Sequence, residues 1–197
     1  VPRGVTHSAF SGDYQKRLAY FLEVMKTLDR KLGPILFQFP YYRETQFPSL
    51  HAFIDAFEPL LASLPPSVQA AVEVRNANWV SEDLLDFLRR HNSAFVLVDH
   101  PWAEPVDKLM QKLDLVTADF CYIRWLGHQT KVEKMTERWD HLVLDKTEAT
   151  QRWVNVLKTL LSRDVRAVYG VYRNRYAGCA PASIDLLKQL WTEENTD

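Results

Sequence analysis

The residues with the most evident chemistry lie in a stretch that otherwise resembles a buried strand. Residues 70–75 read Ala-Ala-Val-Glu-Val-Arg. Because side chains alternate along a strand, Glu73 and Arg75 share one face, opposite Val72 and Val74. A buried charge is costly unless it is paired or takes part in chemistry. We therefore predict that Glu73 is a catalytic acid or base and that Arg75 holds an anionic or hydroxylated substrate.

The alternative for these two residues is a structural ion pair. Alternate residues on a strand lie about 6–7 Å apart at their Cα atoms, so each charge could instead pair with a neighbouring strand.

Two further charged residues stand at the ends of predicted strands. Asp99 closes the apolar stretch 94–98 and is a candidate second catalytic carboxylate beside Glu73, as in glycoside hydrolysis. An Asp before a turn is also common, so a loop-capping role remains open. Arg124 ends the strand 120–125 and suits recognition of phosphate or sugar, or a structural ion pair with Glu73.

Four polar residues complete the predicted substrate-binding set. Asn174 and Tyr176 follow the last predicted strand, and in many barrels the loop after the last strand helps to bind phosphate. An ordinary loop leading into the last helix is the alternative. Gln38 ends the first predicted strand, and His7 lies close to the start of the chain.

The elements that must position these residues alternate along the chain. Apolar periodicity predicts helices at 13–31, 48–64, 81–90, 147–161 and 183–191, and strands at 35–39, 70–75, 94–99, 120–125 and 165–172. Strands that alternate with helices indicate a parallel sheet of βαβ units.

An open doubly wound sheet and a (β/α)₈ barrel both fit this alternation. An open sheet binds ligands near one switch point, whereas polar residues on every strand end favour a barrel. A barrel has eight strands and we find five. We therefore predict one α/β domain over residues 1–197, a TIM-barrel-like parallel (β/α) barrel that lacks its first strands. The long polar segment 127–146 is either a lid or a solvated loop.

Composition narrows the function classes. The chain has 197 residues, 47% hydrophobic and 25% charged, and its net charge of −1 gives no long-range reason to expect nucleic acid, which tends to bind a basic face. No apolar run reaches the ~20 residues of a membrane span, and the start shows no signal peptide. Cys121 and Cys179 are expected to be free thiols, which predicts a cytoplasmic protein. No cofactor fingerprint and no metal-ligand spacing is present, so no cofactor and no metal are predicted.

Five segments together resemble a known family. They read, in order, Pro2-Arg3-x-x-Thr6-His7, Gly33-Pro34-x-Leu36-x-Gln38-Phe39-Pro40, Val72-Glu73-x-Arg75-x-x-x-Trp79, Thr117-Ala118-Asp119-Phe120-x-Tyr122-x-Arg124 and Asn174-x-Tyr176-Ala177-Gly178-x-Ala180-Pro181. This pattern resembles the YecE-like family, domain of unknown function 72. The resemblance implies a TIM-barrel-like fold in which residues 1–4 follow the third strand, and it implies no particular reaction. The sequence has Arg175 and Cys179 where family members often have histidines.

Two functions follow as hypotheses. The first is a metal-independent acid–base hydrolase for a small polar or anionic substrate bearing phosphate or sugar. The second is a non-catalytic nucleotide- or nucleic-acid-binding module that uses arginines and nearby aromatic residues, which the near-neutral charge disfavours. The sequence leaves the oligomeric state open.

Overall fold

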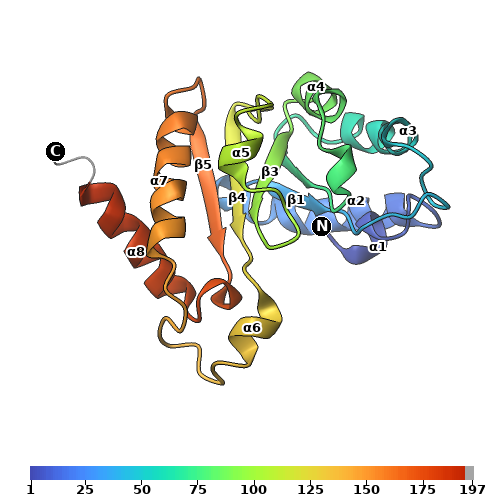
Figure 1. Ribbon diagram of the computed structural model, residues 1–197. Coiled ribbons are helices and arrows are strands. Elements are labelled where there is room, and N and C mark those ends of the chain that lie inside the picture. The colour runs from blue at the N-terminus through green and yellow to red at the C-terminus, as the bar shows by residue number, and fades with distance from the viewer. Residues whose placement is uncertain (194–197) are drawn as a thin grey trace. The chain divides into compact units, whose positions relative to one another are not determined.

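The computed structural model describes residues 1–193 and divides into two compact units (Figure 1). The first unit consists of Val1–Phe95 with Asp114–Ala118, and the second of Val96–Leu113 with the chain from Asp119 onward. Each unit is described by itself below.

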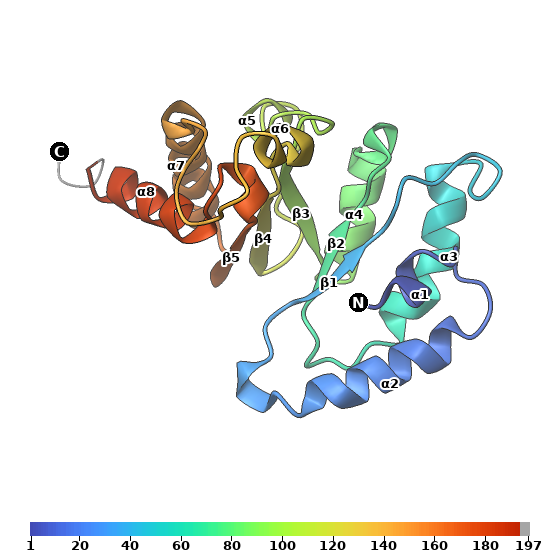
Figure 2. The same ribbon diagram turned by 90° about the horizontal axis from the view of Figure 1, so that it is seen from below.

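The first unit contains two full strands, the start of a third, and the helices between them. Its elements are α1 (Arg3–Thr6), α2 (Tyr14–Lys26), the 3-10 turn η1 (Asp29–Lys31), β1 (Ile35–Gln38), α3 (Leu50–Ala62), β2 (Ala70–Glu73), the 3-10 turn η2 (Ala77–Trp79) and α4 (Glu82–Arg90). Helix α1 packs on α2, and α3 packs on α4 (Figure 2).

Aromatic side chains fill the core of this unit. Phe53 of α3 is fully buried, with its ring centroid 4.8 Å from that of Trp79 and 5.0 Å from that of Phe39. All four residues of β2 are buried. The segment Asp114–Ala118 belongs here because the Thr117 hydroxyl accepts from Phe95 N at 2.7 Å and donates to the Ser93 carbonyl.

In its described part, the second unit carries the remaining strands and four α-helices of different lengths. Its elements are α5 (Val106–Leu109), β4 (Phe120–Trp125), α6 (Gln129–Glu133), α7 (Thr147–Leu161), β5 (Ala167–Tyr172), the 3-10 turn η3 (Asn174–Tyr176) and α8 (Ala180–Glu193). Helices α7 and α8 pack on each other and run alongside β5 (Figure 1).

Strand β3 (Ala94–Asp99) begins in the first unit and continues in the second. Its first two residues pair with β2 and its last four with β4, and all strand pairs along the order β1-β2-β3-β4-β5 are parallel. The predicted fold class is confirmed. The chain is an α/β protein with the parallel strands and βα alternation of a TIM-barrel-like fold. The single-domain boundary and the absence of earlier strands stay predictions.

Several predicted boundaries differ from the structure for local reasons. The helix expected over 13–31 ends at Lys26, and Asp29, the first residue of the short turn η1, adopts a positive φ of 46°. Ser81 stands at the N-cap of α4, but its hydroxyl donates to the Trp79 carbonyl instead of capping the helix. Residues Val106–Leu109 form the short α5, and the polar segment 127–146 contains α6. Residue Arg3 begins α1, and the Val1 amine donates to the Leu36 carbonyl at 2.9 Å.

Candidate functional site

In the first unit, Glu73 and Arg75 form a direct ion pair. Glu73 ends β2 with 1% of its surface exposed, and its Oε1 accepts from Arg75 Nε at 3.0 Å. The long arginine side chain reaches the carboxylate at the end of β2, so the Cα separation does not keep the two charges apart. This is the arrangement that the structural alternative expected, and a catalytic role for Glu73 stays a prediction.

Two other predicted residues lie near this pair. Gln38 stands in register with Glu73 across β1 and β2, so both side chains leave the sheet on the same face. His7 follows α1, and its Nδ1 lies 3.0 Å from the Thr6 hydroxyl. Burial, and then the positive charges of Arg3 and Arg75, lower the pKa of His7.

The charges near His7 predict how its pKa changes when they are removed. Replacing Arg75 or Arg3 by Ala removes a positive charge that disfavours protonation, so the pKa of His7 should rise in both variants. Titration of the His7 ring by NMR measures it. Arg43→Ala, an exposed arginine in the same unit, is the control and should leave the titration unchanged. An unchanged His7 titration in Arg75→Ala would show that the two side chains do not interact.

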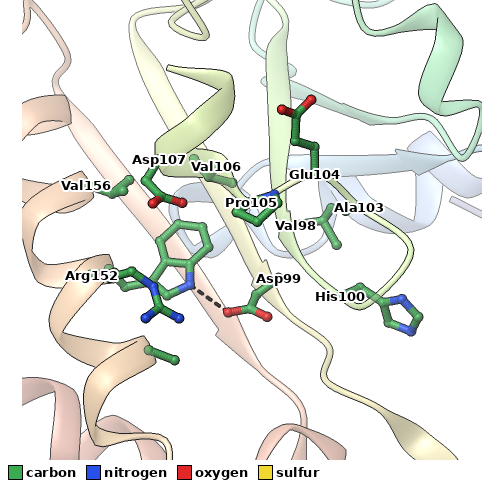
Figure 3. A pocket seen from close by; sticks show the side chains of 12 residues that line it. Val98, Asp99, His100, Ala103, Glu104, Pro105, Val106, Asp107, Arg152 and Val156 are labelled. Atoms are coloured by element: carbon green, nitrogen blue, oxygen red, sulfur yellow. Dashed lines mark hydrogen bonds between the residues drawn. The ribbon is translucent and has the colours of Figure 1, made fainter. Parts of the chain in front are cut away.

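In the second unit, the Asp99 carboxylate is held at the end of β3. Its Oδ2 accepts a hydrogen bond from Trp153 Nε1 at 2.7 Å (Figure 3) and another from the Tyr176 hydroxyl at 3.2 Å. The Asp99 carbonyl accepts from the backbone N–H groups of Leu126 and Gly127 at 3.0 and 3.2 Å. In the described part of the chain, Oδ2 therefore has two donors, whereas Oδ1 has no protein donor.

Aromatic side chains surround this carboxylate. Trp125 on β4 is the register partner of Asp99, and Tyr172 on β5 is the register partner of Trp125. The rings of Trp125 and Tyr172 stack with centroids 4.1 Å apart. The Trp125 ring also meets that of Trp153 edge to face at 5.2 Å, and Tyr172 meets Tyr176 at 5.3 Å. Burial, and then the charge of Asp99, raise the pKa of both tyrosines, so both keep their protons at neutral pH.

A pocket of about 120 Å³ opens beside Asp99 (Figure 3). It has room for a few water molecules or a small polar group, because one water fills about 30 Å³ of liquid. The lining residues are Val98, Asp99, His100, Ala103, Glu104, Pro105, Val106, Asp107, Ala149, Arg152, Trp153 and Val156. Arg152 lines the same pocket as Asp99, whereas His100 points away from Asp99 (Figure 3).

Two other predicted residues of this unit, Arg124 and Asn174, are directed away from the Asp99 carboxylate. Arg124 stands in register with Val98, one residue before Asp99, so strand alternation directs Arg124 and Asp99 to opposite faces. Asn174 accepts from Ala180 N at 2.9 Å through its Oδ1 and so caps the start of α8. Of the predicted residues in this unit, the structure brings together Asp99 and Tyr176. Their roles toward substrate stay predictions.

Sequence reasoning missed the two residues of α7 at this site. Both Trp153 and Arg152 lie in the helix predicted over 147–161, but the sequence pattern singles out neither as a site residue. One signal that could point to Trp153 is its hydrogen-bonding requirement, because a buried indole N–H needs an acceptor and Trp153 is 6% exposed. That requirement shows that a partner exists but does not name it.

A family model described as "Protein of unknown function DUF72" matches residues 1–197. The chain belongs to the DUF72 family. This confirms the YecE-like resemblance. No protein with curated annotation matches this DUF72 chain.

Solved structures of DUF72 family proteins share the fold. One from Thermotoga maritima is 26% identical, with a TM-score of 0.67 over 100% of this chain and 72% of the other. One from Enterococcus faecalis is 16% identical, with a TM-score of 0.64 over 93% of this chain and 70% of the other. A second structure from that organism is 17% identical, with a TM-score of 0.59 over 99% and 76%.

Three further features concern the chemistry available to the DUF72 chain. Within residues 1–193, no helix is both long and apolar enough to cross a bilayer. In that same described range, His, Cys, Asp and Glu do not gather in groups of three or more that suit a metal ion. Cys121 and Cys179 are buried free thiols, as expected.

Proposed function

We propose that this DUF72 protein is a hydrolase that acts by metal-independent acid–base chemistry on a small substrate bearing phosphate or sugar, with Asp99 as the reacting carboxylate. The observation that carries the proposal is the unequal environment of the two carboxylate oxygens. Two donors occupy Oδ2, whereas Oδ1 has no donor in the described chain and Asp99 lines a pocket. A carboxylate that is held on one side and open on the other is poised for proton transfer.

The proposed step uses Oδ1 and a water molecule. Oδ1 accepts a proton from the water while the water oxygen attacks the electrophilic carbon or phosphorus of the substrate. The bond from that atom to the leaving oxygen breaks, and Asp99 returns the proton to the leaving group. Trp153 and Tyr176 keep the carboxylate in one orientation throughout, and the guanidinium of Arg152 offsets the negative charge that develops nearby.

Glu73 remains the other predicted catalytic carboxylate, with Arg75 as a predicted substrate-binding residue. The near-complete burial of Glu73 and its ion pair with Arg75 favour a structural role for the pair. A buried charge that loses its partner destabilises the fold strongly, by about 3–5 kcal/mol. A large loss of unfolding free energy in Glu73→Gln with an unchanged rate of turnover would identify that structural role.

The test of the proposal compares turnover of phosphate monoesters and glycosides with chromogenic leaving groups. We expect Asp99→Asn to lower kcat/KM at least about a hundredfold, the usual contribution of one acid–base group. The matched control is Asp164→Asn, an exposed carboxylate of the same unit that should keep the wild-type rate. Equal rates for Asp99→Asn and the wild type would refute the role of Asp99.

The alternative is the non-catalytic binding module. It predicts salt-dependent binding of a nucleotide or single-stranded nucleic acid with no turnover of any ester or glycoside by the wild type.

A further inference from the structure

A second pocket in the second unit has a lining of unusual chemistry. It is lined by Trp139, Arg173, Asn174 and Arg175, and shares no lining residue with the pocket at Asp99. Its volume of about 340 Å³ falls in the range of ~300–1,000 Å³ that is typical of small-molecule sites. It is therefore large enough for a ligand of its own.

The guanidinium of Arg175 is held in place with one edge in use. Its Nε donates to Glu133 Oε1 at 2.8 Å, and about a third of each side chain is exposed. The two Nη groups have no protein partner in the described chain, so four N–H bonds of a fixed fork remain available. A planar fork of this kind matches two oxygens of a phosphate group.

Asn174 offers a donor for a similar reason. Its Oδ1 already accepts from the N–H of Ala180 at 2.9 Å, whereas no protein acceptor within residues 1–193 takes its Nδ2 hydrogens. The capping bond therefore fixes which end of the amide is free. The amide can give hydrogen bonds to a ligand but has its acceptor occupied.

No carboxylate lines this pocket. The nearest acid along the chain, Asp140, is engaged by Arg138 at 3.4 Å and by His141 at 2.7 Å. The pocket thus combines the Nη edge of Arg175, whose Nε edge is taken by Glu133, with the amide donor of Asn174 and the indole of Trp139. A lining of hydrogen-bond donors that includes a guanidinium fork favours a ligand that accepts hydrogen bonds and carries negative charge. The indole adds a flat apolar surface on which a ring can stack.

We propose that this pocket binds a small phosphate monoester whose phosphate is attached to a flat-ringed group, the chemistry of a nucleoside monophosphate. The phosphate lies on the Nη edge of Arg175 and the Asn174 amide, and the ring lies on Trp139. The site is independent of hydrolysis at Asp99.

The test titrates the whole chain with AMP, adenosine and inorganic phosphate by calorimetry. We expect AMP to bind more tightly than either fragment. Arg175→Gln should weaken AMP binding about tenfold to a hundredfold, the usual value of a charge-assisted contact. The AMP affinity of Arg175→Lys, which keeps the charge but loses the fork, should lie between those of the wild type and Arg175→Gln. Trp139→Ala should lower the affinity for AMP while leaving the affinity for inorganic phosphate unchanged.

The matched control is Arg166→Gln, which removes the same charge from a residue of this unit whose side chain is 85% exposed. Urea unfolding of each variant shows whether the fold is intact. The proposal is overturned if neither phosphate probe binds, if adenosine binds as tightly as AMP, or if the Arg175→Gln and Arg166→Gln variants bind AMP equally. Binding of a single-stranded oligonucleotide but not of AMP also overturns it.

Discussion

Replacing Gly127 by Ala is expected to destabilise the protein by about 3–5 kcal/mol, because two separate costs add. Gly127 follows β4 with a φ of +67°, a left-handed conformation that costs other residues about 1 kcal/mol. An added Cβ would also lie 2.5 Å from the Arg175 carbonyl oxygen and closer still to the Tyr176 Cα. Both atoms are backbone, so no rotamer change can relieve the overlap.

The same substitution has a functional consequence. Tyr176 must shift to admit the new methyl group, and its hydroxyl is one of the two donors to Asp99. Gly127→Ala should therefore lower turnover as well as stability if Asp99 acts as proposed.

The chain supplies a matched control at Gly12. Its φ of +68° is nearly identical, but nothing lies within 4 Å of an added Cβ. Gly12→Ala should cost only the conformational part, about 1 kcal/mol. Urea unfolding of the two variants separates strain from overlap. Equal losses of unfolding free energy in the two variants would show that the backbone at Tyr176 moves aside without a cost in stability.

Replacing Asn76 by Asp is expected to cost about 3 kcal/mol, although the two side chains have the same shape. Asn76 is buried after β2, and its Oδ1 accepts from Tyr42 N while its Nδ2 donates to the Tyr42 carbonyl, both at 2.9 Å. This pair ties the loop after β1 to the loop that carries Arg75. A carboxylate cannot donate, so a buried carbonyl would lose its partner and face a negative charge.

The loss should depend on pH in a known direction. The charged form of the new carboxyl is disfavoured in the fold, so its folded pKa lies above the ordinary value of about 3.9. The protonated form can donate again, and the deficit is smallest below about pH 3.9 and grows as the pH rises through the folded pKa. Unfolding free energies of Asn76→Asp measured against pH would show this trend. The exposed Asn78→Asp serves as control, and a loss that is independent of pH would contradict the pairing.

The prediction from sequence was most accurate where the signal is local. The pattern of residues 70–75 predicts a buried strand that carries two charges, and β2 occupies most of that stretch, with Glu73 and Arg75 paired at its end. The roles of the two charges toward substrate stay predictions. The weaker predictions were those in polar segments. The segment 127–146 has no apolar period, and its short helix α6 was not foreseen.

The sequence by itself determined the strands, their alternation with helices, the α/β class and the family, because periodicity and short motifs are properties of neighbouring residues. Only the tertiary structure decided the partners of each polar group. Asp99 meets Trp153 and Tyr176 across 54 and 77 residues of chain, and Asn76 meets Tyr42 across 34. Such pairs depend on which elements pack together, and nothing in the local pattern of either partner names the other.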